Sequence, residues 1–361
     1  MPAPDDRPRH ARRRPAGDHL QAALTGTPVW EIAMKLCRIL PALCLAGLPW
    51  VLPAAPAHAY IAYTSNERDN TMSVIDLDKG KTIRTVDTGQ RPRGILVTPD
   101  GKEILVCDGD DDMIQIFDSK TFKVVGEIDT PDPELFALRG ENPLYVSNEN
   151  DALVSVFEIP SGKKLASIPT GVEPEGMAVS PDGNTIVNTS ETTNMAHFID
   201  YKQEKIVANV LVDPRPRNAR FRHDGKEVWV SSELGGTVSV IDPVKHVITH
   251  KISFPIQGLR GDAIQPEDIR FTKDDKLAFV ALGPANRVAV VNTSTYKVER
   301  YLLVGARVWH LGFTPDYKYL LTANGLTNDV SVIDVPDLRV IRSIPVGRLP
   351  WGVVVNPKSA P

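Results

Sequence analysis

The sequence predicts an all-β fold, a seven-bladed β-propeller built from four-stranded antiparallel blades. A short strand-like segment recurs seven times, with steps of 42, 40, 42, 42, 50 and 42 residues. Each copy closes on an acidic or amide residue, namely Asp76, Asp118, Glu158, Asp200, Asp242, Asn292 and Asp334. A second marker keeps the same phase, the turn aspartates Asp100, Asp182, Asp224, Asp274 and Asp316. A period of about 40 residues with four short strands per copy is typical of a propeller.

The last repeat shows how each element is assigned. Strands rich in Val, Ile and Leu are expected over 319–323, 329–334, 339–345 and 352–355. A polar loop (324–328), a Pro-Asp turn (336–337) and a Gly-x-x-Pro loop (347–350) separate them. Alternating β-branched runs and turn residues of this kind predict an antiparallel meander. The innermost strand of each blade is expected to be a short apolar run, as at 94–98 and 176–180.

The two ends of the repeat array predict how the ring closes. The array begins at 60–66, which matches the second strand of a repeat, and ends at 352–355, which matches a first strand. Pairing of these two segments would complete the first blade and leave no blade with an open edge. The propeller is therefore expected over residues 60–355, followed by a short tail at 356–361.

The first 59 residues are set apart from the fold. Residues 34–59 have the features of a cleavable signal peptide: Lys35 and Arg38, an apolar run over 39–52, and Ala57-His58-Ala59 as a cleavage site. Cleavage near Ala59 and a periplasmic location are expected. Residues 1–33 lack these features and are interpreted as an upstream extension from a start codon assigned too early.

Charge and cysteine content narrow the function classes. The chain has a formal net charge of −4, and removal of a leader with seven basic and four acidic residues leaves −4 − 3 = −7. An acidic domain offers no basic surface for nucleic acid. Cys107 is the only cysteine after residue 59, which excludes an intrachain disulfide, a C-x-x-C-H haem site and a cysteine-based zinc site there. No cofactor, metal site or membrane span is expected, and the protein is expected to be a monomer.

Candidate binding residues come from the loops that lead into each innermost strand. Three of these loops read Gly-x-x-Pro-x-Gly, at 89–94, 171–176 and 347–352, and the others are degraded copies. The residues beside the proline position vary between both charges and tryptophan, whereas structural positions repeat. The predicted ring at the channel mouth contains Arg91, Arg93, Glu134, Glu173, Glu175, Arg215, Arg217, Glu267, Asp268, Arg307, Trp309, His310 and Trp351.

Two interpretations of this ring remain open. It is either a charged and aromatic funnel for a polar ligand or partner loop, or a set of ion pairs that neutralise one another and close the channel. Trp309, His310 and Trp351 fall in adjoining blades and could form one aromatic patch. The fifth repeat is longer than the others, which predicts a long loop over 254–268 on the same face. Long loops on rigid scaffolds often carry binding function.

Several stretches resemble known families. The copies YTSNERDNTMSVID and LTANGLTNDVSVID resemble the YVTN-type propeller repeats of secreted bacterial and archaeal proteins. The last third contains AIQPEDI (263–269), VALGPANRVAVVN (280–292), VGARVWHLGFTPD (304–316) and VGRLPWGVVV (346–355). These stretches are similar to periplasmic β-propeller proteins associated with pyrroloquinoline-quinone (PQQ)-dependent alcohol catabolism. The resemblance implies that the protein accompanies quinoprotein dehydrogenases, cytochromes and a transporter, and it assigns no catalytic residue.

Three functions remain in view from the sequence. The first is a periplasmic binding or accessory protein for PQQ-dependent alcohol oxidation, whose channel-mouth loops contact a partner protein or a small polar ligand. The second is an enzyme of the lactonase or lyase kind, with Glu175 or Glu267 as base and an arginine that stabilises an oxyanion. The third is a cell-surface scaffold without a small ligand. No nucleophile, metal cluster or Ser-His-Asp arrangement stands out to support the second function. Quinoprotein dehydrogenases typically have eight blades, so the chain is expected to work beside a quinoprotein rather than as one.

Overall fold

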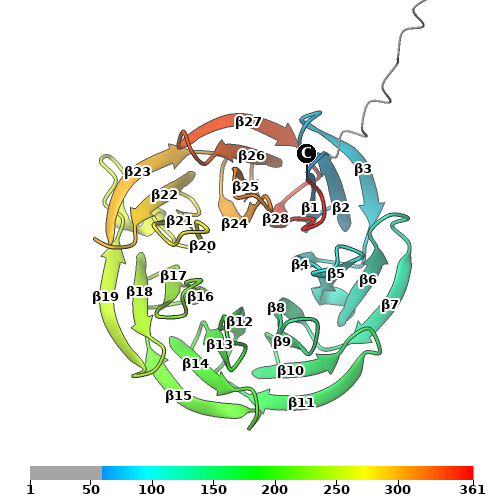
Figure 1. Cartoon of the computed structure of the whole chain (residues 1–361), viewed down its shortest axis with the longest axis horizontal. Coiled ribbons are helices and arrows are strands. Elements are labelled where there is room, and N and C mark those ends of the chain that lie inside the picture. Colours follow the sequence, from blue (N-terminus) through cyan, green and yellow to red (C-terminus); the bar gives the residue numbers. More distant parts are fainter. Residues whose placement is uncertain (1–58, 361) are drawn as a thin grey trace, which may run out of the picture. The chain divides into compact units, whose positions relative to one another are not determined.

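The computed structural model describes residues 59–360. Within this range the chain forms seven four-stranded antiparallel sheets, arranged as blades around a central axis (Figure 1). The predicted seven-bladed propeller is thereby confirmed. The upstream extension and nearly all of the predicted signal peptide lie outside the described residues. No helix between residues 59 and 360 is both long enough and apolar enough to span a membrane.

The blades are numbered I to VII, and the strands of each are given from the axis outward. Blade I contains β28 (Pro350–Val355), β1 (Ile61–Asn66), β2 (Thr71–Asp76) and β3 (Lys81–Asp87). Blade II contains β4 (Pro92–Val97), β5 (Glu103–Asp108), β6 (Met113–Asp118) and β7 (Val124–Asp129). Blade III contains β8 (Pro133–Leu138), β9 (Leu144–Asn148), β10 (Leu153–Glu158) and β11 (Lys163–Pro169).

The remaining four blades follow the same order. Blade IV contains β12 (Pro174–Val179), β13 (Thr185–Ser190), β14 (Met195–Asp200) and β15 (Lys205–Leu211). Blade V contains β16 (Pro216–Phe221), β17 (Val228–Ser232), β18 (Thr237–Asp242) and β19 (Val247–Ser253). Blade VI contains β20 (Ile269–Phe271), β21 (Leu277–Ala281), β22 (Arg287–Asn292) and β23 (Lys297–Leu303). Blade VII contains β24 (Val308–Phe313), β25 (Tyr319–Asn324), β26 (Asp329–Asp334) and β27 (Arg339–Pro345). Two short 3-10 turns lie in loops elsewhere, η1 (Gly109–Asp111) after β5 and η2 (Gly261–Ala263) after β19.

Blade I closes the ring as the sequence predicted. Strand β28 pairs with β1 in antiparallel register, with Ala62 opposite Val355 and Thr64 opposite Val353. Packing between blades continues across this junction, because Tyr60 and Ile75 of blade I share a buried cluster with Leu321 of blade VII. The last strand of the chain is therefore an integral part of the first blade.

Glycines in the innermost strands explain the Gly-x-x-Pro-x-Gly loops. A Cβ atom on Gly94 would lie 2.5 Å from the carbonyl oxygen of Glu134, and one on Gly176 would lie 2.6 Å from that of Arg217. The same holds for Gly352, whose Cβ would lie 2.8 Å from the carbonyl oxygen of Arg93. Only glycine lets neighbouring innermost strands approach this closely around the axis.

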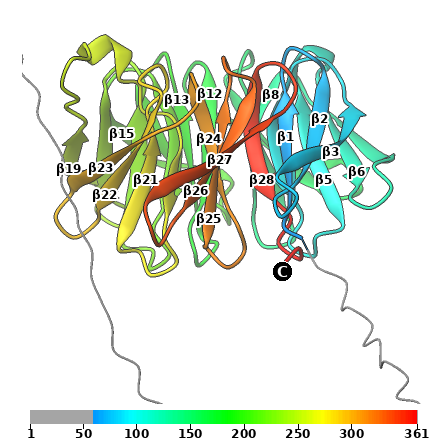
Figure 2. The same ribbon diagram turned by 90° about the horizontal axis from the view of Figure 1, so that it is seen from above.

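The two faces of the ring differ (Figure 2). One face, called the loop face, carries the loops between blades and the loops between the second and third strands. The long loop between β19 and β20 projects from this face. The opposite face, called the turn face, carries the tight first-to-second-strand turns, such as 98–102, and the C-terminal end of the chain. The two faces present different chemistry and are described in turn.

Candidate functional site

The loops between blades hold their key residue in a left-handed backbone conformation. The residue before the proline position has a positive φ in six blade junctions, at Arg91, Asp132, Glu173, Arg215, Arg307 and Leu349. The backbone N–H of Arg307 donates to Asn286 Oδ1 (2.9 Å), and that of Arg215 donates to Asn194 Oδ1 (3.0 Å). A non-glycine residue in this conformation costs free energy, so it persists only where surrounding contacts hold it. Such residues cluster at functional sites. This hydrogen bond from the backbone fixes the direction of the side chains that follow each such residue.

One group of charges surrounds Glu134 at the start of β8. Its side chain is fully buried and accepts from Arg91 Nη1 (2.6 Å) and Arg93 Nη1 (2.8 Å). Arg91 also pairs with Asp132, and Arg93 pairs with Glu67 (3.3 Å). Burial opposes ionisation of Glu134, but the two arginines outweigh it and its pKa is lowered. This carboxylate is therefore charged and fully engaged.

A second group is centred on Arg217, whose side chain is 8% exposed. Its guanidinium contacts Glu175 (3.3 Å) and Glu267 (3.3 Å), and it also pairs with Glu191 and with Glu233 (3.7 Å). One buried cation thus faces four carboxylates from four different loops or strands. It joins blades IV, V and VI through a single side chain.

Arg215 and Arg307 extend this second group. Arg215 pairs with Glu191 (2.9 Å) and Glu233 (3.0 Å), and Arg307 pairs with Glu233 (3.0 Å) and Glu267 (3.5 Å). Arg215 remains 44% exposed, whereas Arg307 is 18% exposed. The arginines of the predicted ring are thus interlocked with carboxylates, and Arg215 is their most accessible member.

Two glutamates of the ring are buried with raised pKa values. Burial raises the pKa of Glu267 to about 8 against the opposing effect of Arg217. Burial also raises the pKa of Glu175 well above its ordinary value, again against Arg217. The two side chains belong to residues that are 2% and 1% exposed. Both carboxyls therefore lie out of reach of a solvent-borne substrate.

The aromatic members of the ring differ in burial and in their contacts. Trp309 is half-buried, with the guanidinium of Arg307 4.0 Å from its ring centroid. Trp351 is 1% exposed, and its ring centroid lies 4.0 Å from that of His310. Only Trp309 is therefore accessible from the loop face, and the three side chains do not form one exposed patch.

Asp268 and His310 lie deeper than the rest of the ring. Asp268 is fully buried and accepts hydrogen bonds from the backbone N–H groups of Ile269 (2.8 Å) and Leu311 (3.0 Å). His310 is in β24 and donates from Nδ1 to the carbonyl oxygen of Trp351 (3.1 Å). Burial, aided by Arg217, lowers the pKa of His310 to about 3, so this imidazole is neutral. His310 lines the central cavity on the turn-face side, and Asp268 pairs with two arginines that line it, Arg220 and Arg270.

Four carboxylates of the network were missed by the sequence analysis. Each directly follows a second strand of a blade: Glu67, Glu149, Glu191 and Glu233. Their spacings of 82, 42 and 42 residues keep the phase of the repeat. This periodicity was a usable signal, because strand ends on the loop face meet the arginines of the inter-blade loops.

Three carboxylates in this region lie close enough to hold a metal ion. Ligand atoms of Asp132, Glu134 and Glu149 fall within 4.8 Å of one another. Arg91 already pairs with Asp132 and Glu134, and Glu149 shares a hydrogen bond with Glu134. Burial and this neighbour raise the pKa of Glu149 to about 8. A guanidinium and a proton therefore supply the positive charge that a cation would provide.

The long loop over 254–268 is anchored at both ends and projects in the middle. Phe254 and Ile264 are buried in the core cluster of blades V and VI. Glu267 and Gln265 both contact Arg307. Between these anchors, residues 257–262 are exposed. The loop thus ends inside the charge network while its tip remains free to contact another molecule.

Comparison with known proteins places the chain among β-propeller families. A family model described as the choice-of-anchor I domain matches residues 136–318, just over half of the chain. The chain belongs to the choice-of-anchor I domain family. A second model, described as a YNCE-like beta-propeller, matches residues 25–131 of this choice-of-anchor I protein.

One curated relative shares part of the sequence. Antigen Lp49 of Leptospira interrogans serogroup Icterohaemorrhagiae serovar copenhageni is 30% identical over 132 residues. The match covers 34% of this choice-of-anchor I protein and 29% of the antigen. The chain thus spans less than a third of that relative's length.

Solved structures of other propellers share the fold. Kuenenia stuttgartiensis hydrazine synthase matches with a TM-score of 0.68 and 22% identity, over 74% of this chain and 90% of that one. A putative 6-phosphogluconolactonase of Bacteroides fragilis matches with 0.69 and 17%, over 84% and 99%. A functionally unknown protein of Desulfotomaculum acetoxidans matches with 0.70 and 13%, over 82% and 98%. At these identities the likeness is one of fold alone.

Proposed function

We propose that this propeller is a periplasmic binding protein that works beside a PQQ-dependent alcohol dehydrogenase and docks that enzyme through its loop face. The resemblance of the last third of the sequence to propellers associated with PQQ-dependent alcohol catabolism supports the choice of partner. The signal-like segment at 34–59 supports the location, with cleavage near Ala59. A cytochrome or a transporter component of the same system is the alternative partner.

The observation that carries the proposal is a set of large apolar side chains exposed on the loop face. Val172 is 50% exposed, Leu234 63%, Leu259 36% and Leu326 67%. All four lie in loops rather than in strands, and they come from the part of the ring between blades IV and VII. Apolar side chains that gather on one face and are rimmed by polar groups mark a protein-binding surface.

The charge network beneath these side chains supports the same reading. Because the arginines are paired with buried carboxylates, the network holds the loops in place and reduces the entropy lost on docking. The burial of Glu175 and Glu267 favours binding over catalysis, since a general base has to reach the proton that it abstracts. Arg215 and the partly exposed Trp309 offer the polar and aromatic contacts common at interfaces.

The test is capture from the periplasm of cells grown on an alcohol. The double variant Leu234→Glu, Leu326→Glu is compared with the double variant Leu211→Glu, Leu303→Glu. Leu211 and Leu303 are each 65% exposed but lie on outermost strands, so the control matches the charge added and the exposure. Captured proteins are identified by mass spectrometry and assayed for PQQ.

Wild-type and control proteins are expected to retain a quinoprotein, and the loop-face variant is expected to lose it. Equal capture by both double variants would remove the loop face from the proposal. Failure of the wild-type protein to retain any quinoprotein would remove the partner.

A further inference from the structure

A cavity of about 520 Å³ lies on the axis of the ring, toward the turn face. The C-terminal halves of the innermost strands line it, together with Pro99, Gly140 and Pro357 near the turns. Of the thirteen residues in the predicted loop-face ring, only His310 lines this cavity. It is therefore a separate space from the charge network, and its volume is within the range of small-molecule pockets.

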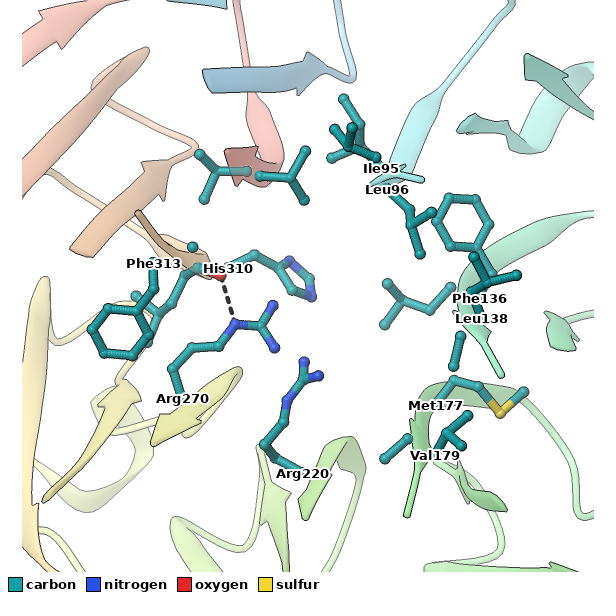
Figure 3. A pocket seen from close by; sticks show the side chains of 18 of the residues that line it. Ile95, Leu96, Phe136, Leu138, Met177, Val179, Arg220, Arg270, His310 and Phe313 are labelled. Atoms are coloured by element: carbon teal, nitrogen blue, oxygen red, sulfur yellow. Dashed lines mark hydrogen bonds between the residues drawn. The ribbon is translucent and has the colours of Figure 1, made fainter. Parts of the chain in front are cut away.

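The cavity has an apolar wall and a cationic wall (Figure 3). On one side lie Leu96, Phe136, Leu138, Met177 and Val179, contributed by blades II, III and IV. On the other side the guanidinium groups of Arg220 and Arg270 point into the space beside His310. Such a division suits a ligand with a hydrocarbon body and one anionic group.

The two arginines are held in place by one buried carboxylate. Asp268 Oδ2 pairs with Arg270 Nη2 (2.9 Å), and Asp268 Oδ1 lies 3.6 Å from Arg220 Nη2. Asn218 Nδ2 also donates to Asp268 Oδ1 (3.0 Å). One carboxylate therefore serves two guanidinium groups, which leaves this wall with one positive charge in excess.

Each arginine keeps donors available for a ligand. Nε of Arg270 donates to the carbonyl oxygen of Leu311 (2.8 Å), and Nε of Arg220 donates to that of Ile269 (3.3 Å). Within residues 59–360, the Nη1 atom of neither guanidinium has a hydrogen-bond partner. Arg220 and Arg270 side chains are 33% and 21% exposed, and the cavity is where that exposure lies.

His310 adds no charge to this wall. Its Nδ1 donates to the backbone of Trp351, so its other ring nitrogen carries a lone pair rather than a proton. Among the side chains that face the cavity, Arg220 and Arg270 are the charged ones. The planar fork of a guanidinium group matches the two oxygens of a carboxylate.

We propose that the central cavity binds a small organic monocarboxylate, with its carboxylate on Arg220 and Arg270 and its hydrocarbon chain against Leu96, Phe136, Leu138 and Met177. The site lies on the turn-face side of the loop-face network, so it is independent of docking at the loop face. The ligand would enter from the turn face.

The test uses three probes that share one carbon chain: hexanoate, hexanol and hexylamine. Isothermal titration calorimetry of the purified protein at neutral pH and low salt is expected to show hexanoate binding at one site. Hexanol is expected to bind at least about tenfold more weakly, because it lacks the charge-assisted hydrogen bonds. Hexylamine is expected not to bind, because the arginine wall repels a cation.

Two variants locate the site. Arg220→Gln, whose wild-type contacts with Ile269 and Asp268 are the longer ones, is expected to weaken hexanoate binding about tenfold or more. Leu138→Trp leaves both arginines in place and is expected to weaken binding by occupying part of the space beside the apolar wall. Arg84→Gln, on the exposed strand β3, is the control for loss of one positive charge and is expected to bind as the wild type does.

Three results would overturn the proposal: no binding of hexanoate, equal binding of hexanoate and hexanol, or unchanged hexanoate binding by Arg220→Gln and Leu138→Trp. Capture of a partner at the loop face would be unaffected by any of these results. The capture experiment and the calorimetry therefore test the docking proposal and the ligand proposal independently.

Discussion

Replacement of Asp108 by asparagine is expected to raise the unfolding free energy of the propeller, and this gain is expected to grow with pH. Asp108 ends β5 and is fully buried, and within residues 59–360 neither of its carboxyl oxygens has a hydrogen-bond partner. Burial raises the pKa of this carboxyl from 3.8 to about 8. The corresponding position holds Asn66, Asn148 and Asn324 in blades I, III and VII, all fully buried, so an amide fits here.

The magnitude follows from proton linkage. The unfolded chain releases the Asp108 proton near pH 3.8, whereas the folded protein keeps it up to about pH 8. Between these values the unfolded state binds fewer protons, so wild-type stability falls as pH rises, by about 1.4 kcal/mol per pH unit. From pH 5 to pH 8 the wild type is expected to lose about 4 kcal/mol relative to Asp108→Asn.

The assay is urea unfolding of both proteins at pH 5, 6, 7 and 8, with the difference in unfolding free energy as the readout. Other titrating groups are common to both proteins and cancel in this difference. Asp87→Asn, at an exposed position of β3, is the control for the same substitution outside the core. A difference for Asp108→Asn that stays flat between pH 5 and pH 8 would refute the reasoning.

Two further predictions concern the network and the axis. Arg217→Met leaves four carboxylates without their shared cation and should cost about 3–5 kcal/mol in unfolding free energy. The control is Arg348→Met, which breaks the ion pair of Arg348, 62% exposed, with Asp69 and should cost less than about 1 kcal/mol. Similar losses for the two variants would contradict a central role for Arg217. Gly176→Ala should cost about 1–3 kcal/mol because its methyl group meets the backbone of β16, whereas Gly126→Ala, with its nearest neighbour at 3.4 Å, should stay within about 0.5 kcal/mol. Unfolding midpoints that do not separate the two alanine variants would argue against close strand contact at the axis.

The fold was predictable because its determinants are periodic. Turn aspartates, short β-branched runs and the Gly-x-x-Pro-x-Gly loops recur in phase, so each blade repeats the same order of strands and turns. Ring closure followed from matching the strand at 352–355 to the missing strand of the first blade. Antiparallel pairing of Val353 with Thr64 is the direct outcome of that match.

The chemistry was predictable only in part, because it depends on which side chains meet across blades. The arginines near the proline positions were found from the sequence, but their partners Glu191 and Glu233 were not. The cavity arginines were missed because innermost strands were expected to be apolar. Arg220 and Arg270 occupy the same repeat position, each before a phenylalanine, and 50 residues apart as blades V and VI are. Comparing the charged residues at each aligned position of the repeats would have revealed these two arginines.

The pairing of β28 with β1 also sets an order of events during biosynthesis. Blade I waits for its innermost strand until β28 (Pro350–Val355) has been synthesised and, on the proposed route, exported. Until then β1 presents an unfinished edge, and the neighbouring blades lack their last contact around the circle. Without β28 the inner edge of β1 would stay unpaired, so blade I is the blade whose completion depends on segments nearly 300 residues apart in the sequence.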